Sequence, residues 1–204
     1  VFGGTALVPQ IHDSLDRLLA RAKEKKAFTV VNTVYDFRNQ RRDPDARWPL
    51  GSSDASYRLI DLLIADLEEA ERLSGCASLD AAMDFFLEKG VGAVIVTNGS
   101  RDVALKIGSA RFEPCTRQAI PVSQAIVAEL AAHPERKGDT TGCGDNFAGG
   151  VIADVARQLD AGNARIDLSE AIAWGSVSGG LACFQFGGVL YEEFPGQKRA
   201  MMAT

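Results

Sequence analysis

The sequence predicts an α/β fold: a doubly wound, mostly parallel sheet with helices on both faces. Three observations favour this class. Short apolar runs typical of buried strands alternate along the chain with longer segments of helical spacing. Glycines follow two of the helical segments, where a C-cap is expected. The composition, with 46% hydrophobic and 24% charged residues among 204, is that of a globular protein large enough to bury a core.

The first half of the chain follows this alternation. Apolar residues with helical spacing run through 11–22, and the lysines that end this segment suit the C-terminal end of a helix dipole. A β-branched, largely apolar strand is expected at 28–34, followed by a polar, proline-bearing loop at 36–53. A short buried strand at 62–65 leads directly into a helix at 66–73, which ends near a glycine.

The second half continues the pattern. A helix is expected at 78–89, again closed by a glycine, and a continuous apolar strand of the parallel-sheet type at 91–97. Two hairpin-like strands follow at 103–107 and 111–116. A last long helix is expected from 167 to about 184, because Asp followed by Glu three residues later is close to a capping box.

Composition and charge exclude several classes of function. The formal net charge is −5 and no block of Lys and Arg stands out, so nucleic-acid binding has no electrostatic support. The apolar runs are too short to span a membrane, and no secretory leader is expected. The four cysteines are widely spaced and only two histidines are present, so the sequence does not favour a zinc site. We expect the cysteines to be free thiols in a reducing cytoplasm.

The most informative segment is a glycine-rich run at 139–150, Asp-Thr-Thr-Gly-Cys-Gly-Asp-Asn-Phe-Ala-Gly-Gly. Glycines there let the backbone turn tightly and approach a ligand closely. The run opens a helix that is expected to begin near Asp145, and such a start offers unpaired N–H groups to an anion. Asp145 would repel a bound phosphate, so its presence favours proton abstraction. The pattern as a whole favours phosphoryl transfer.

This run resembles the signature of the ribokinase-like (PfkB-type) carbohydrate kinases, Asp-Thr-Thr-Gly-Ala-Gly-Asp-Ala-Phe, with Cys143 and Asn146 in place of two alanines. The resemblance implies that Asp145 is the catalytic base. It also implies an anion hole formed by the amides of Gly142, Cys143 and Gly144. The alternative is an ordinary turn into a helix with an Asp as N-cap. Cys143 is either a spacer of alanine size or a thiol with a pKa lowered by the helix N-terminus.

Asp66 and Glu69 are similar to an Asn-x-x-Glu pair of the same family, with Asp in place of Asn. The resemblance implies that they help to hold Mg²⁺ beside the phosphates of ATP. Carboxylates three residues apart share one helix face and can bind Mg²⁺ through water. The alternative is a solvated acidic helix start, because such residues are common in a first turn.

A strand end in the position of the family's Thr-x-Gly element carries Thr97, Asn98, Gly99 and Arg101. The resemblance implies that these residues contact the ribose and phosphates of ATP, and it places Thr141 beside the nucleotide as well. Taken by itself, the segment is a strand that ends in an Asn-Gly turn.

Two further segments lie where the family contacts its ligands. Asn32, Asp36 and Arg38 stand near the position of an Asp-x-Asn-x-Arg stretch, which implies contacts to the substrate; a polar loop is the alternative. The last helix has a face of small residues that includes Gly175 and Ser178. Glycine inside a helix costs about 1 kcal/mol relative to alanine, so something should pack closely there. In the family this helix walls the adenine pocket and the next loop, here with Gly187, closes it; close helix packing is the alternative.

The resemblance covers nearly all of the chain but only the C-terminal part of the family's fold, which places an N-terminal part and a lid outside this chain. A single nucleotide-binding kinase domain is expected over 1–204. The expected activity transfers the γ-phosphate of ATP to a hydroxyl of a sugar or sugar-like small molecule and uses Mg²⁺. A homodimer is one expected oligomeric state. A non-catalytic relative that binds nucleotide or sugar is the second hypothesis. A Rossmann-type dinucleotide enzyme is disfavoured, because no Gly-x-Gly-x-x-Gly turn lies early in the fold.

Overall fold

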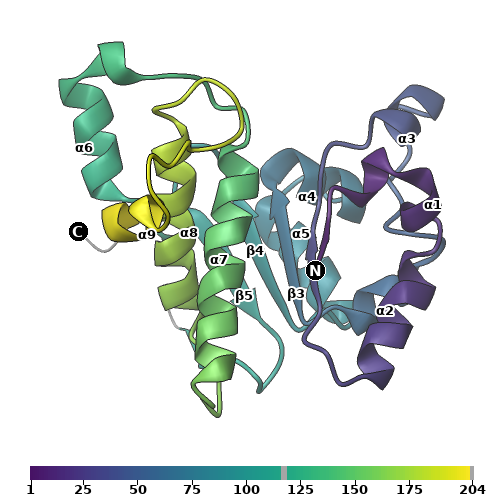
Figure 1. The fold of residues 1–204 in the computed structure, drawn as a ribbon. Coiled ribbons are helices and arrows are strands. Elements are labelled where there is room, and N and C mark those ends of the chain that lie inside the picture. Colours follow the sequence, from purple (N-terminus) through teal and green to yellow (C-terminus); the bar gives the residue numbers. More distant parts are fainter. Residues whose placement is uncertain (116–118, 203–204) are drawn as a thin grey trace. The chain divides into compact units, whose positions relative to one another are not determined.

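A computed structural model describes residues 1–115 and 119–202 (Figure 1). These residues form two compact units. The first unit contains 1–98 and 104–115, and the second contains 99–103 and 119–202. Within the described residues, no helix is both long and apolar enough to cross a membrane.

The first unit is built on a mixed sheet with the strand order β1-β2-β3-β4-β5. The strands are β1 (Phe2–Gly3), β2 (Val30–Asn32), β3 (Leu62–Asp66), β4 (Ala93–Thr97) and β5 (Val103–Ile107). β1 to β4 run parallel, and β5 pairs antiparallel with β4. β3 and β4 are continuous apolar runs buried on both faces, as parallel strands usually are. The predicted α/β class with a mostly parallel sheet is confirmed.

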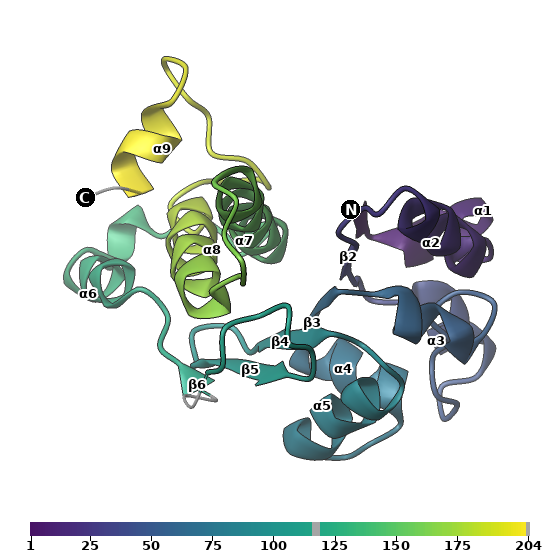
Figure 2. The ribbon, with the colours of Figure 1, turned by 90° about the horizontal axis from the view of Figure 1, so that it is seen from below.

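The described residues of this unit contain five α-helices: α1 (Pro9–His12), α2 (Leu15–Glu24), α3 (Phe37–Arg42), α4 (Leu67–Ser74) and α5 (Leu79–Glu88). Two short 3-10 helices lie at Thr5–Leu7 and Asp54–Leu59. α4 and α5 lie on the same face of the sheet, against β3 and β4 (Figure 2). The core lies on that face and joins sheet, helices and loops through buried side chains such as Leu19, Trp48, Tyr57, Leu63, Phe86 and Val94.

Local signals explain why these helices begin and end where they do. Asp66 caps the start of α4 in a capping box with Glu69, and Gly75 ends it in the left-handed conformation with φ 75°. The Ser78 side chain accepts the N–H of Ala81 and opens α5.

The structure corrects three of the expected elements. The helix expected at 11–22 is divided into α1 and α2, with Asp13 as the C-cap of the first. The loop expected at 36–53 contains α3, because the Asp36 side chain accepts the Asn39 N–H and caps a helix there. Of the strand expected at 111–116, residues 111–115 contain an isolated bridge at Phe112, and residue 116 lies outside the described residues.

The second unit is mainly helical, with α6 (Gln124–Ala132), α7 (Cys143–Asp160), α8 (Leu168–Ala182), α9 (Gln197–Met202) and the short strand β6 (Ala119–Ile120). α7 and α8 lie side by side in both views (Figures 1 and 2). Glycines make this approach possible: a Cβ built on Gly150 would lie 2.7 Å from the Trp174 carbonyl oxygen. α7 begins two residues before the expected Asp145, and α8 opens with Asp167 as its N-cap.

Candidate active site

The glycine-rich run forms a tight turn that opens α7. Gly142 is the N-cap and has φ 74°, a left-handed conformation that residues with a Cβ rarely adopt. A Cβ at this position would also lie 2.5 Å from the Cα of Gly188. Both observations restrict the position to glycine and bring the loop at 188 against the start of the helix.

Asp139 holds this turn to the segment that follows α8. Its Oδ1 accepts the N–H of Thr141 at 2.9 Å, and its Oδ2 accepts the N–H of Gly187 at 3.3 Å. The Asp139 N–H donates to the Gln185 carbonyl at 3.0 Å. Thr141 and Gly187, which the family resemblance predicts to lie near the nucleotide, thus both bind the Asp139 carboxylate.

Asn146, for which the sequence predicts no role of its own, connects the parts of this loop. Its Nδ2 donates to the carbonyl oxygens of Gly142 and Gly188, each at 2.8 Å. Its Oδ1 accepts from Lys198 Nζ at 2.5 Å, and its backbone carbonyl accepts from Ser178 Oγ at 2.7 Å. An amide side chain both donates and accepts hydrogen bonds, whereas the methyl group of alanine does neither. The presence of Asn at this position of the signature could therefore have indicated that residue 146 holds the loop.

Backbone donors and a carboxylate lie together at the first turn of α7. The Cys143 N–H donates to the Thr140 carbonyl at 3.2 Å, so it is engaged within the loop. Gly144 is exposed, and a Cβ built there would meet no atom within 4 Å. Asp145 is exposed as well. Open space beside a helix N-terminus with glycine amides is suited to an anion.

Asp145 also lines a pocket of about 940 Å³ that is formed within the second unit by α7, α8 and the C-terminal segment with α9. Three cationic side chains, Arg157, Lys198 and Arg199, line it as well. Burial lowers the pKa of Lys198. The pocket therefore combines the carboxylates of Asp145, Asp154, Asp160 and Glu192 with the three cationic groups, and it is large enough for a small-molecule ligand.

The Cys143 thiol lies beside the thiol of Cys183, with 3.1 Å between the two Sγ atoms. Burial, together with the neighbouring Cys183, raises the pKa of Cys143. This favours the spacer alternative over a thiol activated by the helix N-terminus.

Close packing accounts for the glycines of α8. A Cβ on Gly175 would lie 2.7 Å from Val151 Cγ2, and one on Gly179 would lie 2.9 Å from the Cys143 carbonyl oxygen. These contacts support the helix-packing alternative at Gly175. A role for Gly175 and Ser178 in an adenine pocket stays a prediction.

In the first unit, polar residues collect at the carboxyl ends of the parallel strands. Asp66 lies directly opposite Thr97, and Asn32 pairs with Ile64. In open α/β sheets, ligands bind at this edge. Thr97 and Asn98 are half-buried. Gly99 and Arg101 are exposed and belong to the second unit.

Glu69 lies at the same edge but is largely buried, with 8% of its surface exposed. Its Oε2 accepts from Thr33 Oγ1 at 2.6 Å and from the Asp66 N–H at 3.1 Å. Burial raises the pKa of Glu69. The sequence predicts no role for Thr33, which lies inside the strand expected at 28–34. In the structure β2 ends one residue earlier, at Asn32, and a polar residue near the end of a predicted strand was the signal that could have found it.

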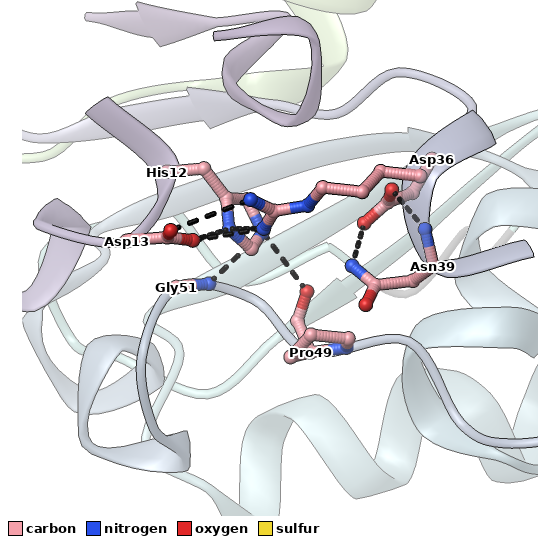
Figure 3. Close-up of polar contacts among 7 residues, drawn as sticks. His12, Asp13, Asp36, Asn39, Pro49 and Gly51 are labelled. Atoms are coloured by element: carbon pink, nitrogen blue, oxygen red, sulfur yellow. Dashed lines mark hydrogen bonds and ion pairs between the residues drawn. The ribbon is translucent and has the colours of Figure 1, made fainter. Parts of the chain in front are cut away.

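Arg38, expected at the substrate, is engaged inside the first unit. Figure 3 shows the polar contacts around His12 and Asp13. Arg38 Nη2 donates to Asp13 Oδ1 at 2.8 Å and lies 3.1 Å from Nδ1 of the buried His12. These contacts lower the pKa of Asp13 to about 2.

Asp36 is engaged in the same region. It is buried, and its two oxygens accept from the backbone N–H and the Nδ2 of Asn39, at 2.9 Å and 2.6 Å (Figure 3). Asp36 and Arg38 therefore have structural partners in this unit, and their contact with a substrate stays a prediction.

Comparison with known proteins decides the family. The model of the pfkB family carbohydrate kinases matches residues 3–193. The chain belongs to this family. The matched range includes the glycine-rich run at 139–150.

Solved structures of kinases share this fold at low sequence identity. Aminoimidazole riboside kinase from Salmonella enterica is 20% identical, with a TM-score of 0.67, and the match covers 100% of this chain and 62% of that one. Ribokinase from Thermotoga maritima is 20% identical, with a TM-score of 0.60 and coverage of 92% and 52%. Fructokinase from Vibrio cholerae is 18% identical, with a TM-score of 0.62 and coverage of 93% and 58%. The chain thus spans between about half and three fifths of the length of these relatives.

Proposed function

We propose that this chain is the catalytic portion of an ATP-dependent phosphotransferase that moves the γ-phosphoryl group of ATP to a hydroxyl of a sugar or sugar-like small molecule. The observation that carries the proposal is the start of α7, where an exposed carboxylate, Asp145, stands beside a glycine turn with open space around Gly144. Family membership supports the reaction class.

Each group at this helix start has a chemical task in the proposal. Asp145 takes the proton of the attacking hydroxyl, as a general base. Because the Cys143 N–H is used within the loop, the amides of Gly142 and Gly144 are the donors assigned to the charge on the transferring group. Asp139 and Asn146 keep the turn in place through their contacts to Gly187 and Gly188.

Asp66 and Glu69 are the carboxylates that the proposal assigns to a Mg²⁺ ion. Asp66 is exposed, whereas Glu69 is buried and accepts from Thr33 and from the Asp66 N–H. Mg²⁺ keeps several of its waters and is often bound through one or two carboxylates together with phosphates. Within the described residues no group of three or more His, Cys, Asp or Glu is placed to hold a metal. The proposal therefore assigns the remaining Mg²⁺ ligands to water and to the phosphates of ATP. Bound Mg²⁺ would neutralise charge on the phosphates.

A non-catalytic relative that binds nucleotide or sugar is the second candidate. The observation in its favour is that Asp36 and Arg38, both expected at the substrate, are engaged with Asn39 and Asp13 instead.

Two further expectations, a location in the reducing cytoplasm and a homodimeric assembly, stay predictions from the sequence.

Replacement of Asp145 by Asn tests the catalytic proposal, and turnover by the wild-type protein is what distinguishes it from a non-catalytic relative. We expect Asp145→Asn to retain ATP binding and to lower kcat by about 10²-fold or more, the scale of general-base removal. The matched control is Asp160→Asn, because Asp160 is an exposed carboxylate that lines the same pocket at the far end of α7. If Asp145→Asn stays within about twofold of the wild-type rate, Asp145 is not the base.

A further inference from the structure

Two thiols in the second unit are placed to react with each other. Cys143 is the first residue of α7, and Cys183 is the C-cap of α8. They are 40 residues apart in sequence, and their Sγ atoms are 3.1 Å apart. Both side chains are partly accessible to solvent.

The surrounding backbone keeps the two cysteines together. The Gly138 N–H donates to the carbonyl oxygen of Cys183 itself at 2.8 Å. On the other side, a Cβ on Gly179 would lie 2.9 Å from the carbonyl oxygen of Cys143, so the two segments are in close backbone contact. A disulfide has its sulfurs about 2.05 Å apart, so the thiols need to approach by only about 1 Å.

We propose that Cys143 and Cys183 form a redox modification site: an intramolecular disulfide that small-molecule disulfides such as oxidised glutathione introduce and thiols remove. This site lies beyond the phosphotransferase activity. The kinase signature does not require a cysteine at position 143, because its usual form has alanine there.

The reaction is a balanced exchange. One cysteine thiolate attacks a sulfur of oxidised glutathione, forms a mixed disulfide and releases one glutathione thiolate. The second cysteine then attacks the protein sulfur of the mixed disulfide and releases the second glutathione. One protein S–S bond forms and one glutathione S–S bond breaks. The two thiol protons pass through solvent to the two released glutathione molecules, and two electrons move from the protein to the glutathione pair.

The site is slow to react but not closed. Burial, Cys183 and the Asp139 carboxylate all raise the pKa of Cys143, so little thiolate is present at neutral pH. A slow exchange suits a modification that responds to sustained oxidation. Cys183 and Asp139 are the ionisable groups that act on Cys143.

The disulfide would restrain the glycine turn. Cys143 lies between Gly142 and Gly144, whose amides carry the anion-binding role in the proposed function, and this consequence rests on that function. Drawing Cys143 toward Cys183 moves the backbone between those two amides. We expect kcat to fall by about tenfold, a smaller loss than the 10²-fold or more that follows removal of one oxyanion donor.

The first test needs no activity. The protein is incubated for several hours with oxidised glutathione at about pH 8, where the thiolate fraction of a cysteine is larger than at neutral pH. Free thiols are then counted, and non-reduced peptides are mapped by mass spectrometry. We expect a peptide pair linked through Cys143 and Cys183, lighter by two hydrogen atoms than the reduced pair. Cys76→Ser, which changes a cysteine of the first unit, should still form it. Separate glutathione adducts on both cysteines, or two unreacted thiols, would overturn the proposal.

The second test measures turnover before oxidation, after oxidation and after re-reduction, each variant relative to its own reduced form. Wild type should lose activity and recover it with dithiothreitol, whereas Cys183→Ser should not respond by more than about twofold. An equal loss in Cys183→Ser would exclude control by the disulfide. Absence of activity in the reduced wild type would instead contradict the proposed function and leave the disulfide result standing.

Discussion

Glu69 carries a carboxyl group whose ionisation is opposed by burial. Because burial raises the pKa of Glu69 above its ordinary value of 4.5, the folded protein binds this proton more tightly than the unfolded chain. Its contribution to folding stability is therefore fully present below pH 4.5 and is lost as the pH rises through the folded pKa. Glu69→Gln keeps an oxygen for Thr33 but removes the titration.

Urea unfolding at a series of pH values measures this effect. The free energy of unfolding of Glu69→Gln, relative to wild type, should increase as the pH rises from 4.5. Glu68→Gln is the matched control, because Glu68 is the exposed neighbour on the same helix turn. A constant difference between Glu69→Gln and wild type across the series would mean that Glu69 is not perturbed.

The sequence could indicate the residue types of the candidate site but not their partners. The glycine turn and Asp145 follow from a contiguous pattern, and the structure has them at the start of α7 as expected. The contacts of Asn146 to Gly188 and Lys198 join residues 42 and 52 positions apart. Such contacts depend on tertiary packing, which local spacing does not encode.

At the scale of elements, α7 and α8 depend on how closely two helices can approach. Gly150 faces α8, where an added Cβ would lie 2.7 Å from a backbone oxygen. Gly149, the preceding residue, faces open space. We expect Gly150→Ala to reduce the free energy of unfolding by about 1–3 kcal/mol, because overpacking outweighs the gain in helix propensity.

Gly149→Ala is the matched control for this prediction. It makes the same chemical change one residue earlier in the same helix, but without a clash, so it should stabilise by up to about 1 kcal/mol through helix propensity. Thermal or urea unfolding of the two variants compares them directly. Equal effects of the same sign would show that contact with α8 does not decide the residue at 150.

The sequence predicts an element well where a local signal, such as an apolar run or a cap, sets its bounds. It predicts an element poorly where a contact with a residue far along the chain sets them. The strand at 62–65 and the helix after it agree closely with β3 and α4, because apolar runs and caps are local. The division of the helix at 11–22 was missed. It occurs at Asp13, whose side chain pairs with Arg38, 25 residues away. Likewise, α3 lies in a segment whose proline and charges predict a loop.

At the scale of the whole molecule, the described residues differ widely in how much of each element is buried. β3 and β4 have four fully buried residues each and hydrogen-bond to a neighbouring strand on both sides. α6 and α9 have no buried residue among those described. α7 and α8 are intermediate in burial, because each buries one face of the helix. Resistance to local opening should follow this order.

Amide hydrogen exchange tests that order under native conditions. We expect the slowest exchange in β3 and β4, whose amides should open only with an energy near that of global unfolding. α7 and α8 should exchange at intermediate rates, and α6 and α9 should exchange fastest, because few buried contacts oppose their opening. Gly150→Ala should speed exchange in α7 and α8 far more than in β3, since its clash lies between those two helices. Protection of α6 equal to that of β3 would contradict the burial-based order and would indicate that contacts beyond those of this chain stabilise the helix.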